Sequence, residues 1–304
     1  MTRGGSAGTD PPPVPCGREW IGVRKLLEAL LVCAFVFGIG MLLYPTVSDW
    51  WNDMHQSRAV AAYQETVVNA SEDERNALWS AAVAYNQRLP RDEGRFTLTD
   101  EEKDAYESVL DVSGTGIMGY VEIPKIDVSL PIYHGMDDTI LQVAIGHIPG
   151  SSLPVGGLGT HCVISGHRGL PSARLFSDID KLEVGDRFTL HVLDRTLTYE
   201  VDQIKTVLPD DLDDLAIEPD KDLCTLVTCT PYGVNTHRLL VRGHRVAEDY
   251  APAPDDEPVQ QVDPRSEALA VGAIALAALL VVFGHRAMRR RRSPQGEGRG
   301  KTEA

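Results

Sequence analysis

A long apolar stretch near the start of the chain constrains the protein more than any other sequence feature. Residues 26–44 (LLEALLVCAFVFGIGMLLY) hold one charged side chain, Glu28. As a helix this stretch is about 28 Å long, close to the thickness of a bilayer's hydrocarbon core. A cleaved signal peptide is the alternative, but its apolar region is usually shorter, and residues 45–49 (PTVSD) make a poor cleavage site. We therefore expect an uncleaved membrane anchor over 26–44.

A second apolar stretch lies near the other end of the chain. Residues 268–283 (ALAVGAIALAALLVVF) are slightly short for a membrane span, and a buried helix of a soluble domain is the competing interpretation. Arg286 and the arginine run 289–292 follow directly. Because such basic clusters are typical of the cytoplasmic flank of a span, we favour a second transmembrane helix over 268–283.

The distribution of charge predicts the topology. The chain has 304 residues and a net charge of −15. Residues 1–25 carry a net +2 and residues 284–304 a net +5, so with Glu28 set aside residues 45–283 carry −21. Because basic flanks stay on the cytoplasmic side, we expect a two-pass protein of the cell membrane with both tails cytoplasmic and the acidic part extracytoplasmic. The acidic balance also argues against nucleic acid as a partner.

The first section of the extracytoplasmic part is predicted to be helical. Apolar residues recur every three or four positions from 49 to 89, which indicates a helix. After a break at Pro90, Thr99 and Glu102 have the spacing of a capping box, which predicts a short helix ending near Leu110. We therefore expect a helical or lid region over residues 45–115.

The next section, residues 116–248, consists of short β-runs separated by turn residues. Many short strands with few helices predict a mainly β fold, either a barrel or a sandwich. We expect a hairpin turn at Asp194-Arg195 and one helix over 172–182, and we expect residues 249–267 to be a linker. The expected strands are 120–123, 128–133, 162–165, 187–193, 197–207, 223–228 and 238–246.

Five cysteines compete for the role of a nucleophile. Cys16 lies in a Pro/Gly-rich head, and Cys33 lies in the first apolar stretch. Cys162 and Cys224 lie inside β-runs, where a cysteine is usually a small buried apolar residue. Cys229 ends its strand and precedes a TPYG loop, which would place its thiol at the rim of the sheet. Cys229 is therefore the candidate nucleophile.

Among the nine histidines, His167 is the candidate partner for that thiol. It lies in SGHRG, at the end of a β-run and beside glycines, and His147 and His237 are alternatives. A single histidine is more often structural than catalytic. No two histidines have the spacing of metal ligands, and Cys224 and Cys229 on one strand make a poor zinc site. We therefore expect no metal and no other cofactor.

The run 225–245 (TLVTCTPYGVNTHRLLVRGHR) resembles the signature of sortases, the cysteine transpeptidases of Gram-positive cell surfaces. In that family TLxTC carries the nucleophile, and an arginine follows nine residues later. Residues 117–126 (IMGYVEIPKI), 130–135 (LPIYHG) and 165–172 (SGHRGLPS) are most similar to class C, the pilus-assembling branch. The resemblance covers about 116–246 and implies a closed eight-stranded sortase-type β-barrel, carrying here an N-terminal helical extension and two transmembrane helices.

The resemblance also implies roles for three catalytic residues. Cys229 would attack the Thr–Gly carbonyl of an LPxTG-like sorting signal and form a thioester. His167 would protonate the leaving amine and later accept a proton from the entering amine. Arg238 would stabilise the oxyanion, although a strand-end arginine paired with an acidic residue is the structural alternative.

Under this interpretation the partners are pilin or surface proteins with LPxTG-like signals, and a pilin lysine amine is the acceptor. The sequence is also compatible with two other functions. One is a housekeeping-type sortase that anchors surface proteins to peptidoglycan, and the other is a catalytically idle surface scaffold with a sortase-like barrel. Intact Cys229, His167 and Arg238 argue against the idle scaffold.

Three further expectations concern the surroundings of the site. Pilus sortases often carry a lid with an Asp-Pro-aromatic motif; residues 91–112 occupy its position but lack Asp-Pro, so we expect a looser cover. Residues 208–222 are either a substrate-recognition loop, by family analogy, or a solvated acidic loop. Cys162 and Cys224 would be neighbours if their strands run in parallel, as the family fold implies, and we expect two buried free thiols.

Overall fold

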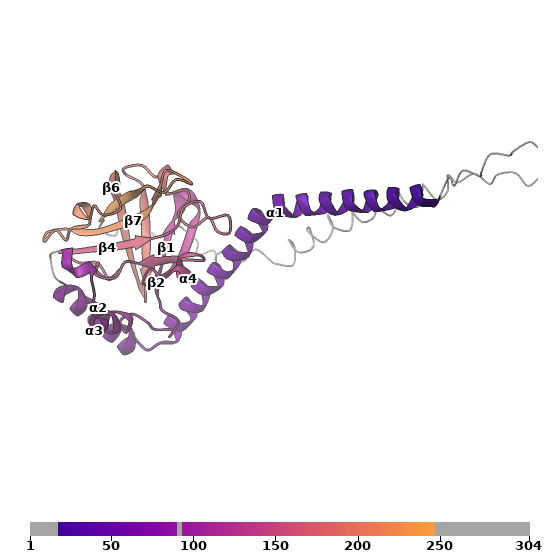
Figure 1. Cartoon of the computed structure of the whole chain (residues 1–304). Coiled ribbons are helices and arrows are strands. Elements are labelled where there is room, and N and C mark those ends of the chain that lie inside the picture. Colours follow the sequence, from indigo (N-terminus) through magenta and orange to yellow (C-terminus); the bar gives the residue numbers. More distant parts are fainter. Residues whose placement is uncertain (1–17, 90–92, 247–304) are drawn as a thin grey trace, which may run out of the picture. The chain divides into compact units, whose positions relative to one another are not determined.

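The computed structural model describes residues 18–89 and 93–246 (Figure 1). Five of the sequence predictions lie outside these residues. They are the Pro/Gly-rich head that contains Cys16, the helix break at Pro90, the linker over 249–267, the second membrane span over 268–283 and the basic tail over 284–304.

The membrane-anchor stretch is part of one long helix, α1 (Arg18–Asn69). Within the described part of the chain, α1 is the one helix long and apolar enough to cross a bilayer, and the side chains of its apolar window are exposed. Pro45 lies inside α1 and removes one of its backbone hydrogen bonds, a common cause of a helix bend like the one that Figure 1 shows. The apolar stretch expected to be the anchor therefore continues without interruption into the part of α1 that packs on the barrel.

The prediction of a single helix over 49–89 is wrong in one respect, because this stretch contains parts of two helices. The helix α1 ends at Asn69, and α2 (Glu72–Arg88) begins after Ser71, whose side chain accepts a hydrogen bond from the backbone N–H of Glu74 (3.2 Å). The capping serine and the acidic first turn stabilise a new helix start, which overrides the continuous apolar periodicity.

The short third helix, α3 (Asp100–Glu107), begins as expected. Thr99 and Glu102 form both halves of the predicted capping box. The 3-10 turn η1 (Glu93–Phe96) precedes it.

Strands β1 to β8 form a closed barrel in the order β1-β2-β3-β4-β7-β8-β6-β5, so the closed eight-stranded barrel is confirmed. Two neighbouring pairs, β2–β3 and β4–β7, are parallel, and the other pairs are antiparallel. The strands are β1 (Ile117–Ile123), β2 (Val128–His134), β3 (Ile145–His147), β4 (Thr160–Ser165), β5 (Arg187–Val192), β6 (Arg195–Val207), β7 (Asp222–Thr230) and β8 (His237–Arg245).

Seven of these strands and the hairpin between β5 and β6 match the sequence predictions, and two features differ. Strand β3 was not predicted, because three residues are too short for an alternating pattern. The helix expected over 172–182 is wrong: that segment is a loop with one 3-10 turn, η3 (Ile179–Lys181). Its apolar spacing reflects Phe176, Ile179 and Leu182, which anchor the loop in the core and are each buried.

The helical extension shares the core of the barrel. The Tyr63 hydroxyl of α1 donates to the Met118 carbonyl (3.1 Å) and accepts from the Leu193 N–H (2.8 Å). Tyr106 of α3 and Leu110 are fully buried in the same hydrophobic cluster as the barrel interior. The extension therefore helps to hold the barrel together and is not a separate flap.

Candidate active site

The three predicted site residues meet at one end of the neighbouring strands β4, β7 and β8. Cys229 lies near the end of β7, directly opposite Arg238 at the start of β8. Ser165 ends β4 in register with Val227 of β7, and His167 follows two residues later. Because β4 and β7 run in parallel, His167 and Cys229 lie at the same end of the two strands.

Backbone contacts determine where the chain turns before His167. The Gly166 N–H donates to the Val227 carbonyl (3.1 Å), and the buried Thr228 hydroxyl donates to the Gly166 carbonyl (2.7 Å). A Cβ on Gly166 would lie 2.7 Å from Ile145 and 2.9 Å from Phe176, so no larger residue fits without displacing these side chains. Thr228 is thus a positioning residue that the sequence analysis missed, although it stands directly before Cys229.

Arg238 is available to a ligand. Its Nη1 donates to the backbone carbonyls of Asn235 (3.5 Å) and His237 (3.3 Å), and it forms no ion pair with any residue that the structure describes. Arg242, further along β8, is by contrast paired with Asp202 (2.9 Å). Among the described residues, no carboxylate therefore pairs with Arg238, as the structural alternative would require.

Arg168 links the loop of the histidine to the loop of the cysteine. Its Nη1 donates to the Thr230 hydroxyl (3.4 Å), its Nη2 is paired with Asp180, and its guanidinium lies 5.9 Å from the centre of the Tyr232 ring. Gly169 has a φ of +79°, and a Cβ there would lie 2.9 Å from the same ring. These contacts hold residues that adjoin His167 against residues that adjoin Cys229.

An apolar surface on the outside of the barrel leads away from Cys229. Val163, Val227 and Leu240 of β4, β7 and β8 form this cluster together with Leu215, and Phe96 packs on it. Val227 precedes Cys229 by two residues, so both side chains project to the same face of β7. We call Val163, Leu215, Val227 and Leu240 the outer apolar face.

The segment at the lid position lies on this outer apolar face. The Arg95 guanidinium lies 4.3 Å from the centre of the Phe96 ring and donates to the Leu215 carbonyl (2.7 Å). A Cβ on Gly150 would lie 2.0 Å from the Arg95 carbonyl oxygen, so only glycine permits this close passage. The turn η1 is therefore held close against the barrel beside the site.

His161 holds the β6–β7 connection against strand β4. Its ring is fully buried, and its Nδ1 and Nε2 lie 2.9 Å from the Ala216 carbonyl and 2.7 Å from the Thr225 hydroxyl. Burial lowers the pKa of His161 to about 4, so the ring is neutral at pH 7. The neutral ring donates from Nδ1 to the carbonyl and accepts at Nε2 from the hydroxyl.

The remaining candidates lie away from the three-residue site or serve the fold. Cys162 and Cys224 stand in register on β4 and β7, and both are buried free thiols, as expected. Burial raises the pKa of the Cys224 thiol well above its usual range. His147 is fully buried between the Tyr106 hydroxyl (2.9 Å) and the Ser152 carbonyl (2.8 Å).

His237 lies next to Arg238 and stands opposite Thr230 across the β7–β8 pair. Its Nδ1 contacts the Thr236 hydroxyl (2.9 Å). Cys33 is exposed on α1. Between residues 18 and 246, as far as the chain is described, no three His, Cys, Asp or Glu side chains cluster in a way that could hold a metal ion.

Comparison with known proteins finds one family for the barrel. The model of the sortase domain matches residues 121–246. Sortase D of Bacillus subtilis is 34% identical over 131 residues, which are 42% of this chain and 63% of that protein. The chain spans between 51% and 63% of the length of the curated relatives that it matches.

Solved structures match a larger share of the chain than the family model does. Sortase C1 of Streptococcus agalactiae is 53% identical with a TM-score of 0.59, and the match covers 63% of this chain and 100% of that one. Sortase C of Streptococcus pneumoniae is 45% identical with a TM-score of 0.56, and the match covers 62% and 97%. Since the whole of a class C relative is matched at this identity, the chain belongs to class C of the sortase family, a family of cysteine transpeptidases.

Proposed function

We propose that this protein is a membrane-anchored transpeptidase that cleaves an LPxTG-like sorting signal and joins the acyl fragment to a lysine amine of a pilin. The observation that carries this proposal is the placement of Cys229, His167 and Arg238 at the same end of three neighbouring strands, with no ion pair to Arg238 from the described residues. The structure of the Streptococcus pneumoniae relative is described as giving insights into pilin substrate specificity, which supports pilin as the substrate class.

The proposed reaction has two halves. In the first, the Cys229 thiolate attacks the threonine carbonyl, the Thr–Gly bond breaks, and His167 gives its proton to the leaving amine. In the second, the entering lysine amine gives a proton to His167 and attacks the thioester, which releases the thiolate. In both halves Arg238 offers N–H donors to the oxyanion of the tetrahedral intermediate.

The proposal includes a location in the membrane. The apolar stretch 26–44 of α1 is the proposed anchor, with residues 45–248 outside the cell and both tails in the cytoplasm. The second span over 268–283 is part of this topology. Labelling of single introduced cysteines near each terminus with a membrane-impermeant maleimide tests it, and labelling from outside at either end would contradict it.

The lid is proposed in a restricted form. Of the described residues between 93 and 112, Phe96 packs on the outer apolar face and Arg95 contacts Leu215, so the proposed cover is the turn η1. Tyr106 and Leu110 are core residues, so removal of 91–112 would damage the barrel and is not a clean test of a lid.

The test is thioester capture by the full chain in detergent micelles. With an LPxTG peptide, wild-type protein should gain the mass of the acyl fragment, and Cys229→Ala should not. Cys33→Ala is the matched control, because that thiol lies in the anchor stretch, and it should retain the adduct. Polymerisation of pilin by Cys229→Ala would overturn the proposal, and transfer to a peptidoglycan amine but not to a pilin lysine would replace pilin assembly with surface anchoring.

A further inference from the structure

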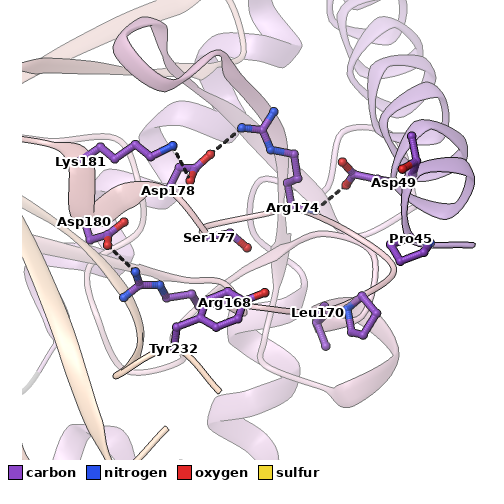
Figure 2. Close-up of a pocket in the computed structure, with 12 residues that line it drawn as sticks. Pro45, Asp49, Arg168, Leu170, Arg174, Ser177, Asp178, Asp180, Lys181 and Tyr232 are labelled. Atoms are coloured by element: carbon purple, nitrogen blue, oxygen red, sulfur yellow. Dashed lines mark hydrogen bonds and ion pairs between the residues drawn. The ribbon is translucent and has the colours of Figure 1, made fainter. Parts of the chain in front are cut away.

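A cavity of about 570 Å³ lies beside the three-residue site, between α1 and the loop that follows His167 (Figure 2). Pro45, Thr46 and Asp49 line it from the helix, and Arg168 and Tyr232 line it from the barrel loops. Its volume is in the range of pockets that enclose small-molecule ligands. None of the three proposed catalytic residues lines it.

The cavity is nevertheless lined by sequence neighbours of two proposed catalytic residues. Arg168 directly follows His167, and Tyr232 is three residues beyond Cys229. The contact between Arg168 and Thr230 (3.4 Å) joins these two walls of the cavity. A group held here would therefore contact residues of the two loops that begin at His167 and Cys229.

The cavity and the outer apolar face lie on opposite sides of the catalytic residues along the strands. On β4 and β7 the outer apolar face consists of residues that precede the site, Val163 and Val227. The barrel residues of the cavity all come after the ends of these strands, in the loops that follow His167 and Cys229. A peptide bound across the site would thus have one end on the apolar face and the other in the cavity.

We propose that the cavity binds the peptide segment that carries the acceptor lysine; this inference rests on the transpeptidase function proposed above. The leaving amine and the entering amine exchange a proton with the same imidazole, so they occupy the same place beside His167. The acyl fragment stays on Cys229 and has the outer apolar face beside it. The amine component therefore binds on the other side of the site, where the histidine loop and the cavity lie.

The charges around the cavity fit a peptide better than a polyanion. Three cations, Arg168, Arg174 and Lys181, are matched by three carboxylates, Asp49, Asp178 and Asp180. Figure 2 shows ion pairs of Asp178 with Arg174 and Lys181 and of Asp180 with Arg168. The balance leaves no excess positive charge for a phosphate and provides carboxylates near an incoming ammonium group.

Arg168 offers a donor that the fold leaves unused. Its Nε is buried and has no hydrogen-bond partner among the residues that the structure describes. A buried N–H without an acceptor is costly, so a peptide carbonyl that reached this atom on a small movement of the Arg168 side chain would be stabilised there.

The test fills the cavity from the helix, on the side away from the catalytic residues. Thr46→Trp places an indole at the cavity wall, and Val47→Trp is the matched control, since Val47 is the next residue of α1, is exposed and does not line the cavity. The full chain in detergent micelles receives an LPxTG amide as donor, so that the leaving fragment is one residue, glycinamide. The acceptor is a lysine-containing peptide, and the measurement is the ratio of transfer to hydrolysis.

We expect Thr46→Trp to lower the ratio of transfer to hydrolysis about tenfold at subsaturating acceptor, which is equivalent to about 1.4 kcal/mol of acceptor binding. Transfer should fall because the acceptor peptide loses its binding site, whereas hydrolysis should not change because water does not bind in the cavity. Hydroxylamine as acceptor should show a smaller loss, and Val47→Trp should keep the wild-type ratio. A wild-type ratio in Thr46→Trp, or an equal fall in both variants, would overturn the cavity assignment while thioester formation continued. Failure of the wild-type chain to form a thioester would instead overturn the transpeptidase function itself.

Discussion

The buried histidine of strand β4 predicts a defined loss of stability in acid. Burial holds the pKa of His161 at about 4, against an ordinary value of 6.5. Between these two values the unfolded chain binds a proton that the folded chain does not bind, so stability falls as the pH falls. The stabilisation is fully present above about pH 6.5 and is lost toward pH 4.

The size of the effect follows from the same two values. One pH unit of difference between the folded and unfolded pKa is worth about 1.4 kcal/mol, so the unfolding free energy should drop by about 2–3 kcal/mol between pH 7.5 and 4.5. That change is a large part of the stability of an ordinary domain. Urea unfolding of the full chain in micelles, followed by the β-sheet circular dichroism signal, measures it.

The variant His161→Gln separates this group from every other titration. Glutamine does not titrate, so the stability difference between wild type and variant should shrink by about 2–3 kcal/mol over the same pH range. The buried carboxyl of Asp222, whose pKa burial raises, is present in both proteins and cancels. His55→Gln is the control, because the ring of His55 is exposed on α1. A wild-type-to-variant difference that is the same at both pH values would refute the reasoning.

Three more predictions address the site. Thr228→Val keeps the side-chain shape but removes the hydroxyl that donates to the Gly166 carbonyl, so the free energy of unfolding should fall by about 1–2 kcal/mol. The kcat of thioester formation should fall by a larger factor than KM changes, and an unchanged kcat would contradict a positioning role. Phe96→Ala should speed alkylation of Cys229 by iodoacetamide, because it uncovers the neighbouring face, and an unchanged rate would argue against a cover. Intact-mass analysis after denaturing, non-reducing alkylation should find every cysteine modified, and a deficit of two labels would mean that the two buried core thiols are bridged.

Much of the barrel follows from local sequence patterns, and its exceptions have physical causes. Alternating β-runs bounded by turn residues located seven strands, since period-two burial is a property of each strand alone. Closure depends on pairing between distant strands, such as β1 with β5, and was expected only through the family resemblance. The loop over 172–182 carries helical apolar spacing because its core anchors happen to fall three or four residues apart.

The site divides in the same way. Cys229 and His167 were recognisable from their places at strand ends, although His147 and His237 remained alternatives, and the family motif supplied Arg238. Thr228, Arg168 and His161 were missed, because each acts through a partner 55 to 62 residues away in the chain. Such partners become visible only when the parallel pairing of β4 and β7 and the path of the β6–β7 connection are known.

Because α1 is continuous, the end of its apolar stretch determines how far the histidine loop can lie from the membrane. Asn52 and Ser48 of this helix donate to the carbonyl of Ser172, in the loop that follows His167. Asn52 is eight residues beyond Tyr44, where the apolar stretch ends, a distance of about 12 Å along a helix. If residues 26–44 fill the bilayer, the histidine loop is held at most about 12 Å above its hydrocarbon core, because the bend at Pro45 tilts this part of α1. A substrate would then have to present its cleavage site close to the lipid headgroups, and a change in the number of residues between 44 and 52 would both raise and rotate the reacting groups.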